Sequence, residues 1–67
     1  MEITLNDTTH TTSENCTLYQ IVFSQIGDKQ KGIAVAVNNS VISKSDWENY
    51  IVKPNDNILI IKATQGG

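Results

Sequence analysis

The chain has 67 residues and a formal net charge of −2. A domain of this size buries only about 60% of the surface that its unfolded chain exposes, so we expect a carrier, a binding module or a small subunit rather than a stand-alone enzyme. Every cationic residue is a lysine. With no arginine to bind phosphates or guanine edges through its planar fork of donors, we expect no nucleic-acid partner.

The apolar residues are spread along the chain, and no run approaches the roughly 20 residues that a membrane span requires. No basic and apolar leader follows Met1. Cys16 is the only cysteine, so no internal disulfide is available, which is consistent with a reducing compartment. We therefore expect a cytoplasmic protein that does not bind membranes.

The first segment predicts a β-hairpin. Ile3 and Leu5 alternate with polar neighbours, the period of two that is typical of a strand with one buried face. Asn6 and Asp7 are turn residues, and the threonine-rich residues 8–12 suit a second strand on a pleated surface.

A helix is predicted next. Thr17 and Gln20 match a capping box, in which each side chain satisfies a backbone N–H of the other residue. Gly27 is suited to end the helix in a left-handed conformation. Between these positions the apolar residues fall at helical spacing: Leu18, Ile21, Val22 and Ile26.

The second half of the chain predicts two strands and a short helical turn. Residues 33–37 are apolar on both faces, as expected of an interior strand. A turn at Asn38 and Asn39 leads into a short strand around residues 41–42. Ser45 and Glu48 match a second capping box, which would start a helical turn that carries Trp47 and Tyr50.

A turn at residues 54–57 precedes the last strand, residues 58–61. The order β-β-α-β-β-short helix-β predicts an α+β fold, a mixed sheet that clasps one helix on one face. The alternation of side chains sends Ile58 and Ile60 to one face of the last strand and Leu59, Ile61 and Ala63 to the other. We expect the second set to form an exposed partner surface, unless a loop or the short helix covers it.

The sequence closes with Gly66 and Gly67 after the polar pair Thr64 and Gln65. Without Cβ atoms, two glycines can be threaded through a narrow cleft by an enzyme that acts on a terminal carboxylate. Extended residues 64–67 would reach roughly 13 Å, at about 3.3 Å each. From these residues alone, simple fraying of a terminus is an equal alternative.

Together these residues resemble the ThiS family of sulfur-carrier proteins of thiamine biosynthesis, over nearly the whole chain. The residues that carry the resemblance are Asn6, Asp7, residues 33–38, Val41, Ile42, Trp47, Ile51, Val52, Asp56, Ile58, Leu59, Gly66 and Gly67. Residues 8–15 and the polar pair Thr64 and Gln65 depart from the family pattern. This departure bears on partner specificity more than on the carrier role.

The resemblance implies a ubiquitin-like β-grasp domain over residues 1–63 and a flexible tail over residues 64–67. It implies that the carboxylate of Gly67, preceded by Gly66, is adenylated and converted to a thiocarboxylate. The implied partners are an adenylating enzyme that uses ATP, a sulfur donor enzyme and thiazole synthase. We expect them to contact Leu59, Ile61, Ala63, Thr64 and Gln65 of a carrier that is monomeric when free and binds no cofactor or metal itself.

Three alternatives share the predicted fold. They are the small subunit of molybdopterin synthase, a ubiquitin-like modifier that forms amide bonds with target lysines, and a binding module whose glycines are incidental. The sequence holds no phosphate-binding loop, so the groups that activate Gly67 would belong to a partner. Cys16 is interpreted as a small apolar filler and His10 as a solvated side chain without partners for a metal site.

Overall fold

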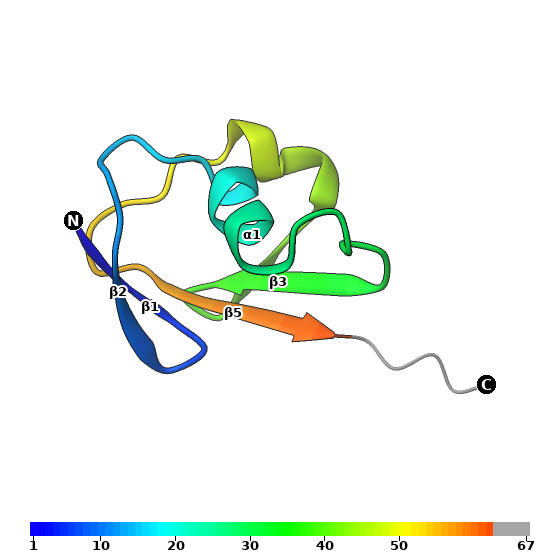
Figure 1. Ribbon diagram of the computed structural model, residues 1–67, viewed down its shortest axis with the longest axis horizontal. Helices are drawn as coiled ribbons and strands as arrows, with labels where there is room; N and C mark the ends of the chain where they lie inside the picture. The colour runs from blue at the N-terminus through cyan, green and yellow to red at the C-terminus, as the bar shows by residue number, and fades with distance from the viewer. Residues whose placement is uncertain (63–67) are drawn as a thin grey trace.

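The computed structural model describes residues 1–62. The elements are β1 (Glu2–Leu5), β2 (Thr8–Thr11), α1 (Leu18–Ile26), β3 (Ile33–Val37), β4 (Ser40–Ile42), the 3₁₀ helix η1 (Lys44–Asn49) and β5 (Asn57–Lys62). This is the predicted order of elements, and α1 and η1 lie over the same face of the sheet (Figure 1). The predicted tail and Ala63 lie outside the described residues.

Within residues 1–62 the strands form one mixed sheet in the order β2-β1-β5-β3-β4. The last strand therefore occupies the middle of the sheet, parallel to β1 and antiparallel to β3. The interior position predicted for residues 33–37 is confirmed, because β3 pairs with β5 on one side and β4 on the other. A mixed sheet that grips one α-helix in this way is the β-grasp fold that the sequence predicted.

Helix α1 begins with the predicted capping box. Thr17 Oγ1 accepts from the Gln20 N–H at 3.2 Å, and Gln20 Oε1 accepts from the Thr17 N–H at 2.9 Å. The helix ends before Gly27, whose φ of 61° favours glycine, as predicted. Its ψ of −134° lies outside the left-handed helical region. The prediction that Gly27 ends the helix in a left-handed helical conformation is therefore wrong.

The second predicted capping box is wrong. Helix η1 begins at Lys44, after Ser43, and no side chain caps it. Its first turn closes through the Asp46 N–H, which donates to the Ser43 carbonyl at 2.8 Å, so Ser45 lies inside the helix. Trp47 explains this placement: its indole is fully buried, and Nε1 donates to the Ile42 carbonyl at 3.0 Å, which holds η1 against the end of β4.

The hydrophobic core lies between the sheet and the two helices. All its members are less than 6% exposed, and they are Ile3, Leu5, Leu18, Ile21, Val22, Val35, Val37, Trp47, Val52 and Ile58. Burial of about ten apolar side chains, at roughly 1.5–3 kcal/mol each, is the main term that offsets the chain entropy of so small a domain.

Candidate functional site on the last strand

The two faces of β5 differ as the sequence predicted. Ile58 is fully buried, and Ile60 packs against the core. Leu59 is half-buried and Ile61 is 49% exposed, and both point to the face that carries no helix. For these two described members, the alternative that a loop or the short helix covers the set is wrong, because Ile61 is half-exposed and η1 lies on the other face, where Trp47 and Ile58 share the core.

Neighbouring strands extend this apolar surface. In the register of the sheet, Leu59 pairs with Ala36 and Ile61 pairs with Ala34, and Ala36 in turn pairs with Val41 of β4. Paired residues point to the same face of a sheet. We call this set the outer-face patch: Ala34, Ala36, Val41, Leu59 and Ile61. Val41 is 72% exposed, so the patch is open to solvent on β4 as well as on β5.

Sequence reasoning found the β5 members of the outer-face patch and missed those from β3 and β4. The double-sided apolar pattern of residues 33–37 was the available signal, since it places Ala34 and Ala36 opposite the core-facing valines. This pattern contains no information on how β3 pairs with β5, so the sequence alone did not connect these alanines to Leu59 and Ile61.

Asn6 fixes the position of β5 beside β1. Its backbone N–H donates to the Ile58 carbonyl at 2.9 Å. After Asn6, which has a φ of 49°, the backbone turns away from β5. The Asn6 side chain then continues the hydrogen bonding between β1 and β5. Asn6 Oδ1 accepts from the Ile60 N–H at 2.8 Å, so the side chain replaces the backbone carbonyl of a longer β1.

A second set of polar contacts fixes where β5 begins. Asp56 is only 7% exposed, and its carboxylate accepts from Asn38 Nδ2 at 3.0 Å and from the Lys53 N–H at 2.8 Å. Asn38 Oδ1 accepts from the Asn57 N–H at 2.9 Å. These bonds join the turn after β3 to the turn before β5. Asp56 therefore has the turn-forming role that the sequence predicted.

The remaining candidates have structural surroundings. Cys16 is half-buried against the core, and its thiol donates to the Ser13 carbonyl at 3.0 Å, in agreement with a filler role. His10 is partly buried because β2 places it opposite Ile3, so the prediction of a solvated side chain needs correction. Within residues 1–62, no three His, Cys, Asp or Glu side chains gather as metal ligands would.

Neither helix of the described part is long and apolar enough to cross a membrane. The predicted reactive residues Gly66 and Gly67, and the predicted contact residues Ala63, Thr64 and Gln65, lie outside the described residues and stay predictions. The described part ends at Lys62, the last residue of β5 and the neighbour of Ile33 in the register.

The sheet order and the single α-helix define a small protein of the β-grasp class, with an apolar face of β5 that is partly open to solvent. Comparison with known proteins identifies its family. The chain belongs to the ThiS family, whose model matches residues 1–67.

The chain is similar to the sulfur carrier protein ThiS of Escherichia coli strain K12, with 28% identity over 100% of both chains. Its fold matches the crystal structure of the thiamine biosynthesis protein ThiS from Geobacter metallireducens, with a TM-score of 0.86 and 19% identity over 100% of both chains. A solution structure of a thiamine biosynthesis protein from the same organism gives a TM-score of 0.79 and 19% identity, over 100% of this chain and 88% of that one.

Proposed function

We propose that this ThiS-family protein carries sulfur for thiamine biosynthesis, as a thiocarboxylate on Gly67. The observation that carries the proposal is the family match, which extends over the whole chain and includes Gly66 and Gly67. The sulfur carrier ThiS of Escherichia coli, which aligns from end to end with this chain, supports the same role. The protein then acts as a co-substrate of partner enzymes in the cytoplasm rather than as an enzyme.

The chemistry follows from the poor reactivity of a carboxylate, whose oxygen is a poor leaving group. In the first step a carboxylate oxygen of Gly67 attacks the α-phosphorus of ATP, and pyrophosphate leaves. A persulfide sulfur on the sulfur donor then attacks the acyl carbon and AMP leaves. Cleavage of the S–S bond by a second thiol of the sulfur-transfer system gives the thiocarboxylate and a disulfide. Thiazole synthase is the acceptor of this sulfur.

The catalytic groups for these steps belong to the partners. The sequence contains no phosphate-binding loop that would hold ATP. The contribution of this chain is to present Gly67 at a fixed reach from a folded domain. Residues 63–67 extend at most roughly 18 Å, at about 3.3–3.6 Å each, so the partner has to contact the domain near the end of β5.

The outer-face patch is the docking surface for the adenylating enzyme. It is apolar, exposed to solvent at Val41 and Ile61, and it includes two residues of the last strand, Leu59 and Ile61. Exposed apolar patches of this kind typically mark protein interaction sites. Because the patch is built on paired strands rather than on a loop, it presents a rigid surface and binding costs little ordering entropy.

Complementation tests the pathway. Cells that lack their own sulfur carrier for thiamine synthesis should grow without thiamine when they express this chain with the adenylating enzyme and thiazole synthase of its own source. Deletion of Gly67 should abolish growth while the protein still accumulates. Restoration of molybdenum-cofactor synthesis instead of thiamine synthesis, in the corresponding deficient cells, would contradict the proposal and favour the small subunit of molybdopterin synthase.

A further inference from the structure

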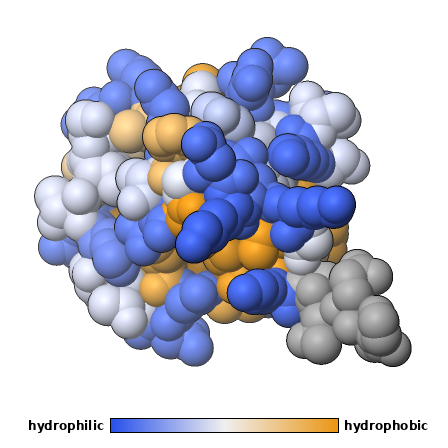
Figure 2. Space-filling view, turned by 45° about the vertical axis from the view of Figure 1, so that its right-hand side comes forward, coloured by the Kyte–Doolittle hydropathy of each residue, from blue (hydrophilic) through white to orange (hydrophobic). Residues whose placement is uncertain are grey.

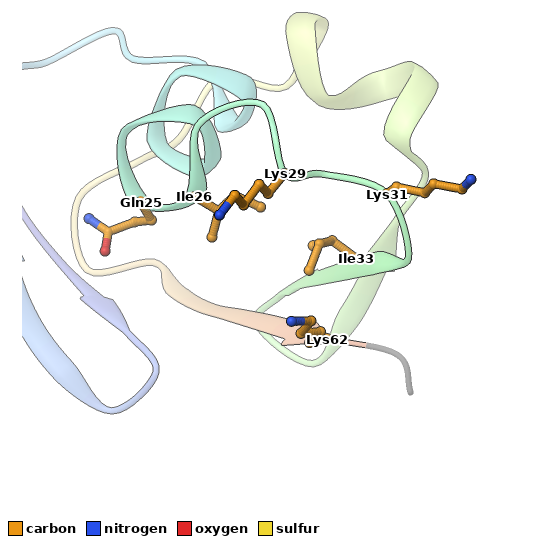
Figure 3. Close-up of a pocket in the computed structure, with 6 residues that line it drawn as sticks. All are labelled: Gln25, Ile26, Lys29, Lys31, Ile33 and Lys62. Carbon is orange, nitrogen blue, oxygen red and sulfur yellow. The ribbon is translucent and has the colours of Figure 1, made fainter. Parts of the chain in front are cut away.

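A second surface lies near the end of β5, on the face of the sheet opposite the outer-face patch. It is a pocket of about 660 Å³ between the end of α1, the loop after it and the adjoining ends of β3 and β5. Its lining residues are Gln25, Ile26, Lys29, Lys31, Ile33 and Lys62. We call it the lysine pocket (Figure 3).

The register explains why the pocket forms at this place. Ile33 and Lys62 are paired at the ends of β3 and β5, and Lys62 shares the helix-facing side of β5 with Ile58 and Ile60. Helix α1 ends at Ile26, and β3 and β5 extend past the helix in the ribbon view (Figure 1). The pocket occupies the space left there.

The charges at this pocket are of one sign. Lys29, Lys31 and Lys62 are three of the five cations in a chain whose net charge is −2, and none of the described lining residues is acidic. Figure 3 shows Lys29 and Lys62 on two sides of the pocket, from the loop and from the strand, while Lys31 extends outward at its edge. The pocket is therefore a local basic site on an acidic protein.

The floor of the pocket is apolar. Ile26 and Ile33 are half-buried and pack against the core, and both line the pocket. The surface view shows an apolar area bordered by hydrophilic side chains on this side of the molecule (Figure 2). A ligand that fits this pocket has carboxylates that pair with the lysines and an apolar group that packs on Ile26 and Ile33.

We propose that the lysine pocket binds an acidic segment of the adenylating enzyme, one that carries an apolar side chain between carboxylates. This inference rests on the proposed function, because it assigns the pocket to the enzyme that activates Gly67. An apolar surface such as the outer-face patch contributes affinity but sets orientation weakly, whereas complementary charges fix orientation and speed association. With contacts on both faces of β5, the enzyme aligns the strand that leads to Gly67.

The test measures affinity for the purified adenylating enzyme by calorimetry or surface plasmon resonance. The variant Lys29→Glu with Lys62→Glu reverses both charges that flank the pocket. We expect it to bind about tenfold or more weakly at low salt, mainly through slower association, as charge changes at interfaces usually act. The difference should shrink toward 1 M salt, where the Debye length falls to about 3 Å. The milder pair Lys29→Met with Lys62→Met keeps the apolar stems and should lose less affinity.

The matched control is Lys44→Glu with Lys53→Glu, which makes the same change in net charge at lysines outside the pocket. It should bind like the original protein, and thermal melting should show that all variants are folded. Equal weakening by both pairs would mean general charge attraction and would overturn the proposal. The proposal would also be overturned if the pocket variant bound as tightly as the original protein, or if the original protein did not bind the enzyme. Binding of ATP alone at Lys29 and Lys62, seen by NMR without the enzyme, would also overturn it, in favour of a phosphate ligand.

Mass spectrometry of sulfur on Gly67 in the same proteins, beside the affinity measurement, separates this inference from the proposed function. If the original protein gains sulfur on Gly67 and the pocket variant binds and gains it equally well, the pocket proposal fails and the carrier function stands. If the original protein binds the enzyme through the pocket but never gains sulfur, the carrier function fails and the docking site stands.

Discussion

Replacement of Ile58 by aspartate should unfold the protein. The Ile58 side chain is fully buried among the apolar side chains of the core. Removal of a buried isoleucine costs about 2–5 kcal/mol, and burial of an unpaired charge adds to this. The total reaches the whole stability of a domain of this size, about 3–10 kcal/mol at 0.05–0.15 kcal/mol per residue. Circular dichroism should show loss of the cooperative melting transition.

The matched control makes the same substitution three positions along the strand, on the opposite face. Ile61 is half-exposed in the outer-face patch, so Ile61→Asp should leave the domain folded, with a change in stability within about 1 kcal/mol. It should weaken binding to the adenylating enzyme by more than 1 kcal/mol, because it brings a charge into an apolar contact. A folded Ile58→Asp protein, or an unfolded Ile61→Asp protein, would show that the faces of β5 are assigned wrongly.

Replacement of Gly66 by valine should block activation without changing stability. A branched side chain next to Gly67 would obstruct the threading of the last residues into the nucleotide site. Displacement of a reacting group by about 1 Å costs on the order of a hundredfold in rate, so ATP–pyrophosphate exchange with the adenylating enzyme should fall at least that far. The melting temperature should stay unchanged.

Gly66→Ala provides the graded comparison, because its smaller side chain should reduce exchange less than valine does. A valine variant that supports exchange at the original rate would rule out close passage of Gly66 through a narrow cleft. In that case the role of the two glycines would have to lie in a later transfer step.

The features that sequence reasoning predicted correctly are those set by local patterns. The capping box of Thr17 and Gln20 needs only residues three apart, and the two faces of β5 follow from alternation along one strand. The start of η1 was predicted wrongly because it depends on tertiary contacts. Burial of Trp47 and its hydrogen bond to the Ile42 carbonyl fix the position of that helix. Ser45 lies inside the helix and does not cap it.

Contacts between distant segments were beyond sequence reasoning. Asn6 and Asn38 were recognised as turn residues, but their bonds to Ile60 and to Asp56 require the sheet order that brings β5 between β1 and β3. The lysine pocket arises in the same way, since Lys62 lines it together with Lys29 and is brought there by its pairing with Ile33. Local periodicity contains neither the register nor the sheet order.

The central claim is that sulfur is carried on the carboxylate of Gly67, and mass spectrometry tests it most directly. After incubation with the adenylating enzyme, ATP and a sulfur donor, the intact protein should gain the mass of one oxygen-for-sulfur exchange, and fragmentation should locate it on Gly67. Deletion of Gly67 or extension by one residue should abolish the gain, and Cys16→Ser should leave it intact. A gain that persists without Gly67, or that disappears with Cys16→Ser, would contradict the account and indicate a persulfide on the cysteine.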